Sequence, residues 1–288
     1  MQYDITVVIV NWKVRDLLEK NLKSIFANTD GLNIEVYVVD NDSRDGTSEM
    51  IMMEFPDVKV LAMARNLGFA KANNLAIKQA KGKYIFVLNP DTQVKSGFFR
   101  SIYDYMEVNS DIGIVGPRIL NSDGSTQPSI RRFPDLLSHI LIMLKLGNVL
   151  LENKILKNYF LADFDYEREQ EVEQIMGAAM MIRRSVFEKI GLFDEKFFVW
   201  FEEVDFCLRA RKEGIKIKYF PQAELYHEGG RSFNKEAIVR KQMIFNKSLL
   251  HYFSKHKAFY QTIIIALLLP INILLTIGYA IYKNPRRP

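Results

Sequence analysis

Short apolar runs rich in β-branched residues alternate with longer stretches in which apolar residues recur at helical spacing. The short runs occupy residues 5–10, 35–39, 58–62, 84–88 and 112–115, and we interpret them as strands. Helical spacing is clearest at 16–27 and 71–80. Strands that alternate with helices in this way predict the α/β class, with a mostly parallel, Rossmann-like sheet flanked by helices on both faces.

The second half of the chain has a less regular pattern. Residues 135–151, 197–212 and 233–257 predict helices, while 174–182 and 215–220 predict strands. Gly177 lies inside the first of these strands. A glycine there marks either the close approach of another group or a simple packing requirement.

The C-terminal segment, residues 258–282, contains no charged residue. As a helix it would be about 37 Å long, which exceeds the roughly 30 Å hydrocarbon thickness of a bilayer. Pro270 and Asn272 in its middle leave a kink or a re-entrant hairpin open. We therefore predict a folded domain at 1–235, a helical connector at 236–257 and a transmembrane or membrane-embedded segment at 258–282. The alternative is a buried helix of a soluble protein.

Polar residues follow four of the predicted strands. They are Asn11 after the first strand, Asp40, Asn41 and Asp42 after the second, Asn66 and Gly68 after the third, and Asn89 and Asp91 after the fourth. Ligands of open α/β sheets bind outside the carboxyl ends of the strands, so these residues are expected to gather at one edge of the sheet. The alternative is that they only form turns.

Carboxylates in two places are suited to chemistry. Asp91, at a strand end, suits a divalent cation that takes oxygen ligands and keeps substrate phosphates in its coordination shell. His227 becomes a candidate ligand only if the fold places it next to Asp91. Glu202, Glu203 and Asp205 place three carboxylates near a helix start, where one of them facing a cleft would serve as a general base. The alternative is a solvated acidic helix start, favoured by the helix dipole.

Composition narrows the classes of function. The net charge of +5 is compatible with anionic partners, but no basic face is interleaved with aromatic residues, so nucleic acid is not expected as a partner. The single cysteine, Cys207, excludes an intrachain disulfide and a cysteine-rich zinc site. The N-terminus lacks the pattern of a signal peptide. Neither the dinucleotide fingerprint G-x-G-x-x-G nor a P-loop is present, which argues against the oxidoreductases and P-loop enzymes that carry them.

Eight segments together resemble the family 2 inverting glycosyltransferases, especially their rhamnosyltransferase-like branch. They follow in family order over roughly residues 5–232: TVVIVNWKVRDLLEKNLKSI, VVDNDSRDGT, NLGFAKANN, GKYIFVLNPDTQV, PSIRRFP, GAAMMIRRSVFEKIGLFDEKFF, FEEVDFCLRARKEG and YHEGGRS. The resemblance implies a GT-A fold for the catalytic domain at 1–235, that is, a Rossmann-like mixed sheet flanked by helices, followed by the C-terminal membrane helix. It also implies a nucleotide-diphosphate sugar donor and a divalent metal, Mg²⁺ or Mn²⁺.

The resemblance assigns most candidate residues to the donor and the metal. Asn89-Pro90-Asp91 occupies the place of the family's Asp-x-Asp motif, so Asp91 is the expected metal ligand, and His227 is an expected metal or diphosphate contact. The remaining donor-binding candidates are Val10, Asn11, Asp40, Asn41 and Asp42 around the nucleotide base, Asn66 and Gly68 in the donor wall, Arg131 and Arg132 near the diphosphate, and Gly177.

The pair Glu202-Glu203 matches the family's Glu-Asp pair, whose second member is the usual base. Glu203 is therefore the expected catalytic base, with Glu202 and Asp205 as alternatives. The implied reaction moves a sugar, rhamnose by branch resemblance, to a glycan or a polyprenyl-diphosphate-linked acceptor in cell-surface polysaccharide synthesis. A membrane anchor would hold the catalytic domain at the cytoplasmic face of the cell membrane, in contact with membrane lipid.

Two other classes of protein are alternatives to this enzyme. A catalytically silent GT-A-like domain would bind a sugar nucleotide at the membrane without turning it over. Such a domain would not need to retain Asp91, Glu203 and His227, so the presence of all three residues argues against it. A processive polysaccharide synthase normally carries a Gln-x-x-Arg-Trp motif, and neither Trp12 nor Trp200 lies in one.

Overall fold

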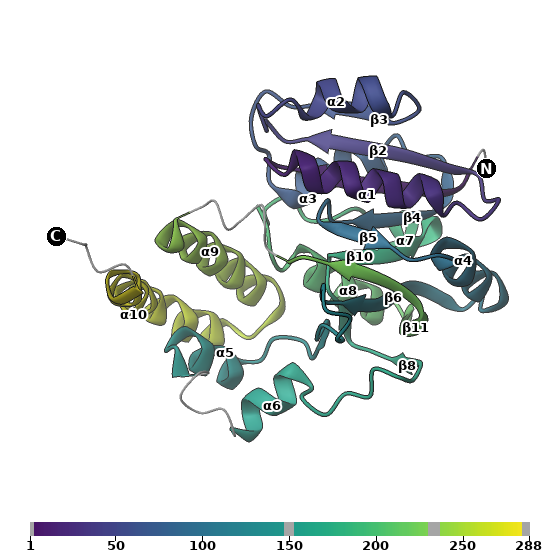
Figure 1. The fold of residues 1–288 in the computed structure, drawn as a ribbon. Coiled ribbons are helices and arrows are strands. Elements are labelled where there is room, and N and C mark those ends of the chain that lie inside the picture. Colours follow the sequence, from purple (N-terminus) through teal and green to yellow (C-terminus); the bar gives the residue numbers. More distant parts are fainter. Residues whose placement is uncertain (1–2, 147–152, 230–236, 284–288) are drawn as a thin grey trace.

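A computed structural model describes residues 3–146, 153–229 and 237–283. Its centre is a mixed sheet with the strand order β3-β2-β1-β4-β10-β6-β11-β5, and β8 pairs with β11 (Figure 1). The strands are β1 (Tyr3–Asn11), β2 (Ile34–Asp40), β3 (Lys59–Ala62), β4 (Gly82–Leu88), β5 (Thr92–Val94), β6 (Ile112–Leu120), β8 (Gln170–Glu171), β10 (Ala179–Arg183) and β11 (Lys216–His227). A separate pair is formed by β7 (Ile130–Arg131) and β9 (Gln174–Ile175).

The first four strands of that order are parallel, as predicted, and the sheet becomes mixed beyond them. β10 runs antiparallel to both β4 and β6, while β6 and β11 are parallel to each other. The parallel arrangement predicted from the strand pattern holds for β1 to β4, and the antiparallel β10 confirms the mixed sheet that the family resemblance implies. β10 is antiparallel because it enters between β4 and β6 from a connection that already lies at the carboxyl ends of the parallel strands.

Helices cover both faces of the sheet because alternate strand residues point to opposite sides. Ile5, Val7 and Ile9 of β1 pack in one core, and Val8 and Val10 in the other. The first core includes buried residues of α1 (Arg15–Ala27), α2 (Thr47–Glu54) and α4 (Phe98–Val108). The second includes those of α3 (Phe69–Ile77), α7 (Arg184–Ile190) and α8 (Glu202–Lys212).

Two predicted elements differ from the structure. The strand predicted at 174–182 is broken, because β9 ends at Ile175 and β10 begins at Ala179, so Gly177 lies in a turn between two sheets. The helix predicted at 197–212 begins only at Glu202, because Trp200 and Phe201 adopt left-handed backbone angles, with φ of 65° and 72°. The last strand also extends further than predicted, so His227 ends β11 rather than following it.

The remaining helices gather beside the sheet domain (Figure 1). They are α5 (Leu136–Met143), α6 (Lys154–Phe160), α9 (Ile238–His256) and α10 (Phe259–Lys283). Parts of the helices predicted at 135–151 and 233–257 lie outside the described residues. Leu249, Tyr252 and Phe253 of α9 form one core with Phe197 and Phe201. The segment predicted as a connector therefore packs against the loop that precedes α8.

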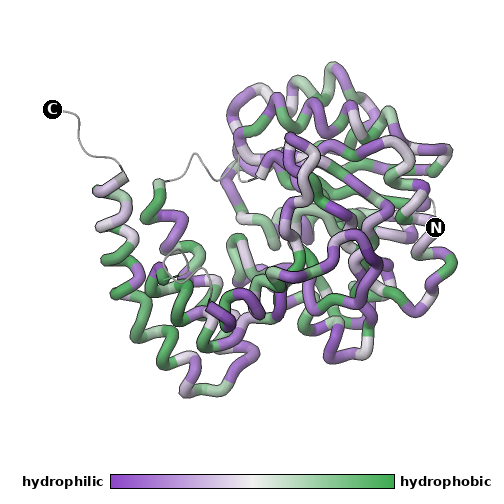
Figure 2. The backbone as a smooth tube through the Cα atoms, turned by 60° about the horizontal axis from the view of Figure 1, so that its bottom comes forward, coloured by the Kyte–Doolittle hydropathy of each residue, from purple (hydrophilic) through white to green (hydrophobic). Residues whose placement is uncertain are grey.

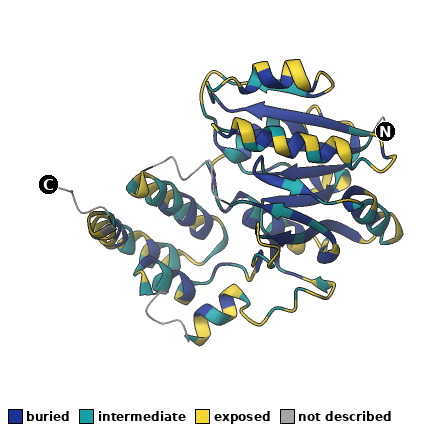
Figure 3. Cartoon of the chain, viewed as in Figure 1, coloured by how far each residue is buried: buried dark blue, intermediate teal, exposed yellow. Residues whose placement is uncertain are grey.

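α10 is a single helix that continues through Pro270, not a re-entrant hairpin. It packs along one side on α9 and α5, and the Asn272 side chain donates a hydrogen bond of 2.6 Å to the carbonyl oxygen of Met143. Its other sides are apolar and exposed (Figures 2 and 3). Within the described residues, Phe259–Tyr282 is the one helix long and apolar enough to cross a membrane.

Candidate active site

A cavity of about 270 Å³ lies at the carboxyl ends of β1, β2 and β4. Ten of the residues singled out from the sequence line it: Val10, Asn41, Asn66, Gly68, Asn89, Asp91, Gly177, Glu202, Glu203 and His227. The predicted convergence of strand ends on one edge is therefore observed. Trp12, Phe198 and Trp200 complete the aromatic part of the wall.

Asp91 and His227 face each other across the floor of this cavity. The Nε2 atom of His227 lies 3.3 Å from Oδ1 of Asp91, and both side chains are buried. On its other side, Nδ1 of His227 lies 2.7 Å from Oε1 of Gln127. Because an amide oxygen only accepts hydrogen bonds, Nδ1 carries a proton there. Nε2 is the ring nitrogen that faces Asp91, and it also lies 3.4 Å from the amide nitrogen of Asn89.

This pair fits a divalent cation that is completed by substrate. A carboxylate oxygen and a neutral imidazole nitrogen are both metal ligands, and Gln127 orients the imidazole as outer-shell partners of metal-binding histidines do. In the described part of the chain, no three His, Cys, Asp or Glu side chains are grouped to hold a metal ion by themselves. Mg²⁺ commonly takes one or two protein carboxylates and fills its shell with water and substrate phosphates.

Glu202 and Glu203 lie at the start of α8, on the wall of the same cavity. The Oε2 atom of each is buried and accepts no hydrogen bond from any residue that the structure describes. Burial raises the pKa of Glu203, and it raises that of Glu202 further with the help of the Glu203 charge. A partly desolvated carboxylate with an open lone pair is suited to accept a proton.

Two glycines lie where the backbone comes close to Glu203 and to the loop before Glu202. A Cβ atom on Gly177 would lie 3.5 Å from Cβ of Glu203, so the turn between β9 and β10 sits directly against the glutamate. A Cβ on Gly68 would lie 2.3 Å from the carbonyl oxygen of Phe198, and Gly68 has a φ of +83°. That carbonyl accepts a hydrogen bond of 2.6 Å from the Phe69 amide, which joins the loop before Glu202 to the start of α3.

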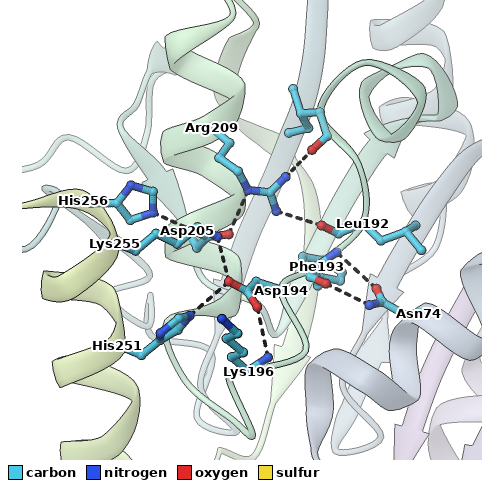
Figure 4. A network of polar contacts seen from close by, with 11 residues as sticks. Asn74, Leu192, Phe193, Asp194, Lys196, Asp205, Arg209, His251, Lys255 and His256 are labelled. Atoms are coloured by element: carbon cyan, nitrogen blue, oxygen red, sulfur yellow. Dashed lines mark hydrogen bonds and ion pairs between the residues drawn. The ribbon is translucent and has the colours of Figure 1, made fainter.

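Asp205 does not line this cavity. Its carboxylate accepts from Arg209 at 2.8 Å, Lys255 at 2.7 Å and His256 at 2.6 Å (Figure 4). Burial opposes its ionisation, but the hydrogen bonds from His256 and Lys255 together with the Arg209 charge keep its pKa below the ordinary value. Through these contacts Asp205 links α8 to α9. Its carboxylate is occupied by protein partners and does not face a substrate cavity.

The other nucleotide-pocket candidates support the wall from behind. Asn41 donates to Oδ1 of Asn66 at 2.9 Å and to the carbonyl oxygen of Gly68 at 3.1 Å. Asn11 donates to the hydroxyls of Ser43 and Thr47, and Asp42 pairs with Arg44. Asp40 accepts from Ser48 through one oxygen. Asn11, Asp40 and Asp42 do not line the cavity.

The two neighbouring arginines point to different places. Arg132 pairs with Glu173 at 3.1 Å and donates to Asn158. Arg131 lines a second cavity, which also contains Glu203. Neither lines the first cavity, where the sequence placed them beside the donor diphosphate.

Residues that the sequence did not single out for the site are Gln127, Trp12, Phe198 and Trp200. Gln127 lies in a turn-rich loop whose composition carries no sign of a contact to His227. Trp12 directly follows Asn11 at a strand end, so the same rule that selected Asn11 also applied to it. Phe198 and Trp200 were assigned to a helix, and their position in the wall depends on the loop that the structure has instead.

Comparisons with known proteins place the chain in a family and match its fold. The family model described as glycosyl transferase family 2 matches residues 6–191, and that described as the N-terminal domain of galactosyltransferase matches 159–229. The N-acetylglucosaminyl-diphospho-decaprenol L-rhamnosyltransferase of Mycobacterium tuberculosis is 29% identical over 80% of this chain and 78% of its own. The rhamnosyltransferase WbbL of Escherichia coli is 26% identical over 84% and 95%. Among solved structures, the mannosyltransferase PcManGT of Pyrobaculum calidifontis, in complex with GDP-Man and Mn²⁺, has a TM-score of 0.57 at 15% identity, covering 100% of this chain and 76% of that one.

Proposed function

The chain belongs to glycosyl transferase family 2, and from that membership we propose that it moves rhamnose from a nucleoside diphosphate sugar to a hydroxyl of a lipid-linked glycan. The expected GT-A fold is confirmed by the mixed sheet and by the likeness to solved structures of this class. Sugar and acceptor rest on two relatives named as rhamnosyltransferases, one of which has a diphospho-decaprenol acceptor in its name.

One observation carries the mechanism. The cavity has Glu203 on one wall and the Asp91–His227 pair on its floor, so a base and a candidate metal site face the same space. A sugar nucleotide bound there would place its diphosphate near Asp91 and leave its anomeric carbon between the two groups. A base and a candidate metal site in one cavity suit a displacement in which the acceptor attacks from the side opposite the leaving group.

The chain's own residues have three tasks in that displacement. Glu203 removes the proton of the acceptor hydroxyl as its oxygen forms a bond to the anomeric carbon. The bond from that carbon to the diphosphate oxygen breaks, and its electron pair leaves with the nucleoside diphosphate, so the anomeric centre is inverted. Asp91 and His227 would hold Mg²⁺ or Mn²⁺, which as a Lewis acid stabilises charge on the departing diphosphate. Trp12, Trp200 and Phe198 give the site an aromatic wall.

The helix α10 supports a membrane location. Phe259–Tyr282 has the length and composition to cross or enter a bilayer, which would bring the active site close to a lipid-linked acceptor. Nucleotide sugars are cytosolic, so the catalytic domain would face the cytoplasm.

The test is release of nucleoside diphosphate by the full chain in detergent. The assay contains Mn²⁺ or Mg²⁺, a panel of nucleotide sugars and N-acetylglucosaminyl-diphospho-decaprenol as acceptor. We expect release from one donor, lost on chelation, abolished in Asp91→Ala and reduced about 100-fold or more in Glu203→Gln. Release that persists in Glu203→Gln but is lost in Glu202→Gln would move the base to Glu202.

The alternative of a silent sugar-nucleotide-binding domain is separated by the same samples. Binding of a nucleoside diphosphate by calorimetry, without turnover on any lipid-linked acceptor, would favour it. The two unpartnered carboxylate oxygens at the cavity argue for the enzyme, because a buried acceptor without a hydrogen bond is costly unless it has a use.

A further inference from the structure

A second cavity of about 310 Å³ adjoins the first and shares Glu203, Met176 and Trp200 with it. Its other walls come from β7, from the helices α5 and α6, from α8 and from α9, through residues that include Arg131, His139, Tyr159 and Phe245. Glu203 therefore separates two cavities and is reachable from both. The first cavity contains the Asp91–His227 pair and is the proposed site of the sugar nucleotide, so we call it the donor cavity. The second cavity is therefore available to the other substrate.

The second cavity places a permanent positive charge beside the base. Arg131 is exposed to solvent, and its guanidinium carbon lies 5.3 Å from the centre of the Phe160 ring. Arg131 and Glu203 line the same cavity. Burial raises the pKa of Glu203, and the Arg131 charge acts in the opposite direction. The neighbouring His139 adds no charge near neutral pH, because burial lowers its pKa to about 4. Arg131 is thus the cation of this wall that would meet an anionic ligand.

Part of the wall is apolar and comes from the two helices that contact α10. Ile142 of α5 and Phe245 of α9 line the cavity. Both helices pack directly on α10, the helix with an exposed apolar surface. A ligand in this cavity therefore has a cation at the end near Glu203 and apolar side chains towards the membrane-type helix.

We infer that the second cavity binds a phosphate- or diphosphate-linked lipid carrying the acceptor sugar, and that Arg131 recognises its phosphate. The acceptor hydroxyl lies at Glu203, and the first part of the lipid chain lies along Ile142 and Phe245. This inference rests on the proposed function. It moves Arg131 from the donor diphosphate, where the sequence placed it, to the acceptor.

The experiment measures binding to the full chain in detergent, with no turnover required. The probe is farnesyl diphosphate, titrated in the presence of a chelator and followed by tryptophan fluorescence, since Trp200 lines both cavities. Farnesol is the uncharged matched ligand. The variant is Arg131→Ala, and the control is Arg132→Ala, whose arginine pairs with Glu173 outside both cavities. A separate titration with nucleoside diphosphates and Mn²⁺ tests the donor site.

We expect farnesyl diphosphate to bind about tenfold or more weakly to Arg131→Ala, with farnesol binding and the Arg132→Ala variant unchanged. In turnover assays Arg131→Ala should raise the KM for the lipid acceptor and leave that for the donor sugar unchanged, with partial rescue by Arg131→Lys. Equal losses in both arginine variants, or displacement of farnesyl diphosphate by a nucleoside diphosphate, would overturn the inference. Failure of the wild-type chain to bind any nucleoside diphosphate would instead overturn the proposed function.

Discussion

The hydroxyl of Ser248 on α9 donates a hydrogen bond of 2.9 Å to the backbone carbonyl of Val199. Val199 belongs to the loop that leads into the glutamates of α8, and Phe197 and Phe201 of the same loop are buried against α9. The helix next to α10 thus holds the segment that positions the candidate base. Two left-handed residues in that loop, Trp200 and Phe201, cost about 1–3 kcal/mol each, so the loop depends on this support.

Replacement of that hydroxyl should loosen the loop at Val199, which lines the active-site cavity, although Ser248 itself does not. Ser248→Ala leaves a buried carbonyl without its partner, at a cost of about 1–3 kcal/mol. We expect kcat to fall several-fold and nucleotide affinity to fall less, because the loosened loop positions the glutamates while Ser248 itself does not line the donor cavity. Steady-state kinetics together with calorimetry would measure this. An unchanged kcat with a lower melting temperature would make the contact structural only.

Gly68 should tolerate no side chain. In Gly68→Ala the new methyl group would meet the Phe198 carbonyl at 2.3 Å, in addition to the strain of a φ of +83°. Gly97→Ala is the matched control, because Gly97 has a φ of +76° and open space around it. Denaturant unfolding should give a loss of about 1 kcal/mol for the control and a clearly larger loss for Gly68→Ala, with weaker nucleotide binding. Equal losses would show that the loop moves aside easily.

Activity should fall at acidic pH through protonation of the base. Burial raises the pKa of Glu203 above its ordinary value of 4.5, and a carboxyl accepts a proton only when ionised. The acid limb of the log kcat/KM profile is therefore expected above pH 4.5, with a slope of about one if a single group is titrated. In Arg131→Ala the limb should move to higher pH, since the charge that opposes the shift is removed. A limb at or below pH 4.5 would contradict the burial of this carboxylate.

The Asp205 link between α8 and α9 should stabilise the protein at neutral pH and fail in acid. The folded-state pKa of Asp205 lies below its ordinary 3.8, so its contribution is present above about pH 4 and is lost as the pH falls through the lower value. Asp205→Asn leaves Arg209 and Lys255 without their shared carboxylate and should cost about 3–5 kcal/mol at pH 7. Unfolding at pH 7 and near pH 3 should show the difference from wild type shrinking. A constant difference would mean that packing, not charge, holds the helices.

Gln127 should affect metal-dependent binding although it touches no substrate. Gln127→Leu removes the partner of Nδ1 of His227, so the imidazole loses its fixed tautomer and orientation. Loss of such an outer-shell contact typically lowers metal affinity about 10- to 100-fold. Calorimetry of a nucleoside diphosphate with Mn²⁺ would measure it. Asn121→Ala is the control, because it removes the other contact of the Gln127 amide and keeps the one to His227.

The parallel half of the fold followed from sequence because each buried strand is a short β-branched run with a polar residue at its end. Phe197, Trp200, Phe201 and Val204 have helical spacing, yet only Val204 is in the helix. Their spacing could not reveal the left-handed turn, because packing on α9, far along the chain, imposes it. The separation of Arg131 and Arg132 could not be predicted from the sequence, because β7 is only two residues long and ends at Arg131, so no strand pattern marks where the chain leaves it.

The packing of α9 on the glutamate loop also sets where the chain can be cut to obtain a water-soluble form for crystallisation. A chain that ends at His227 would retain the central sheet and every side chain that lines the donor cavity. It would, however, expose Phe197 and Phe201 to solvent and lose Phe245 from the wall of the second cavity. Ending the chain at Lys257 would keep α9 and expose only the surfaces that α10 covers. Such a shortened form is the better candidate for a crystallisable enzyme, with detergent or apolar-to-polar substitutions on α9 and α5 replacing the lost helix.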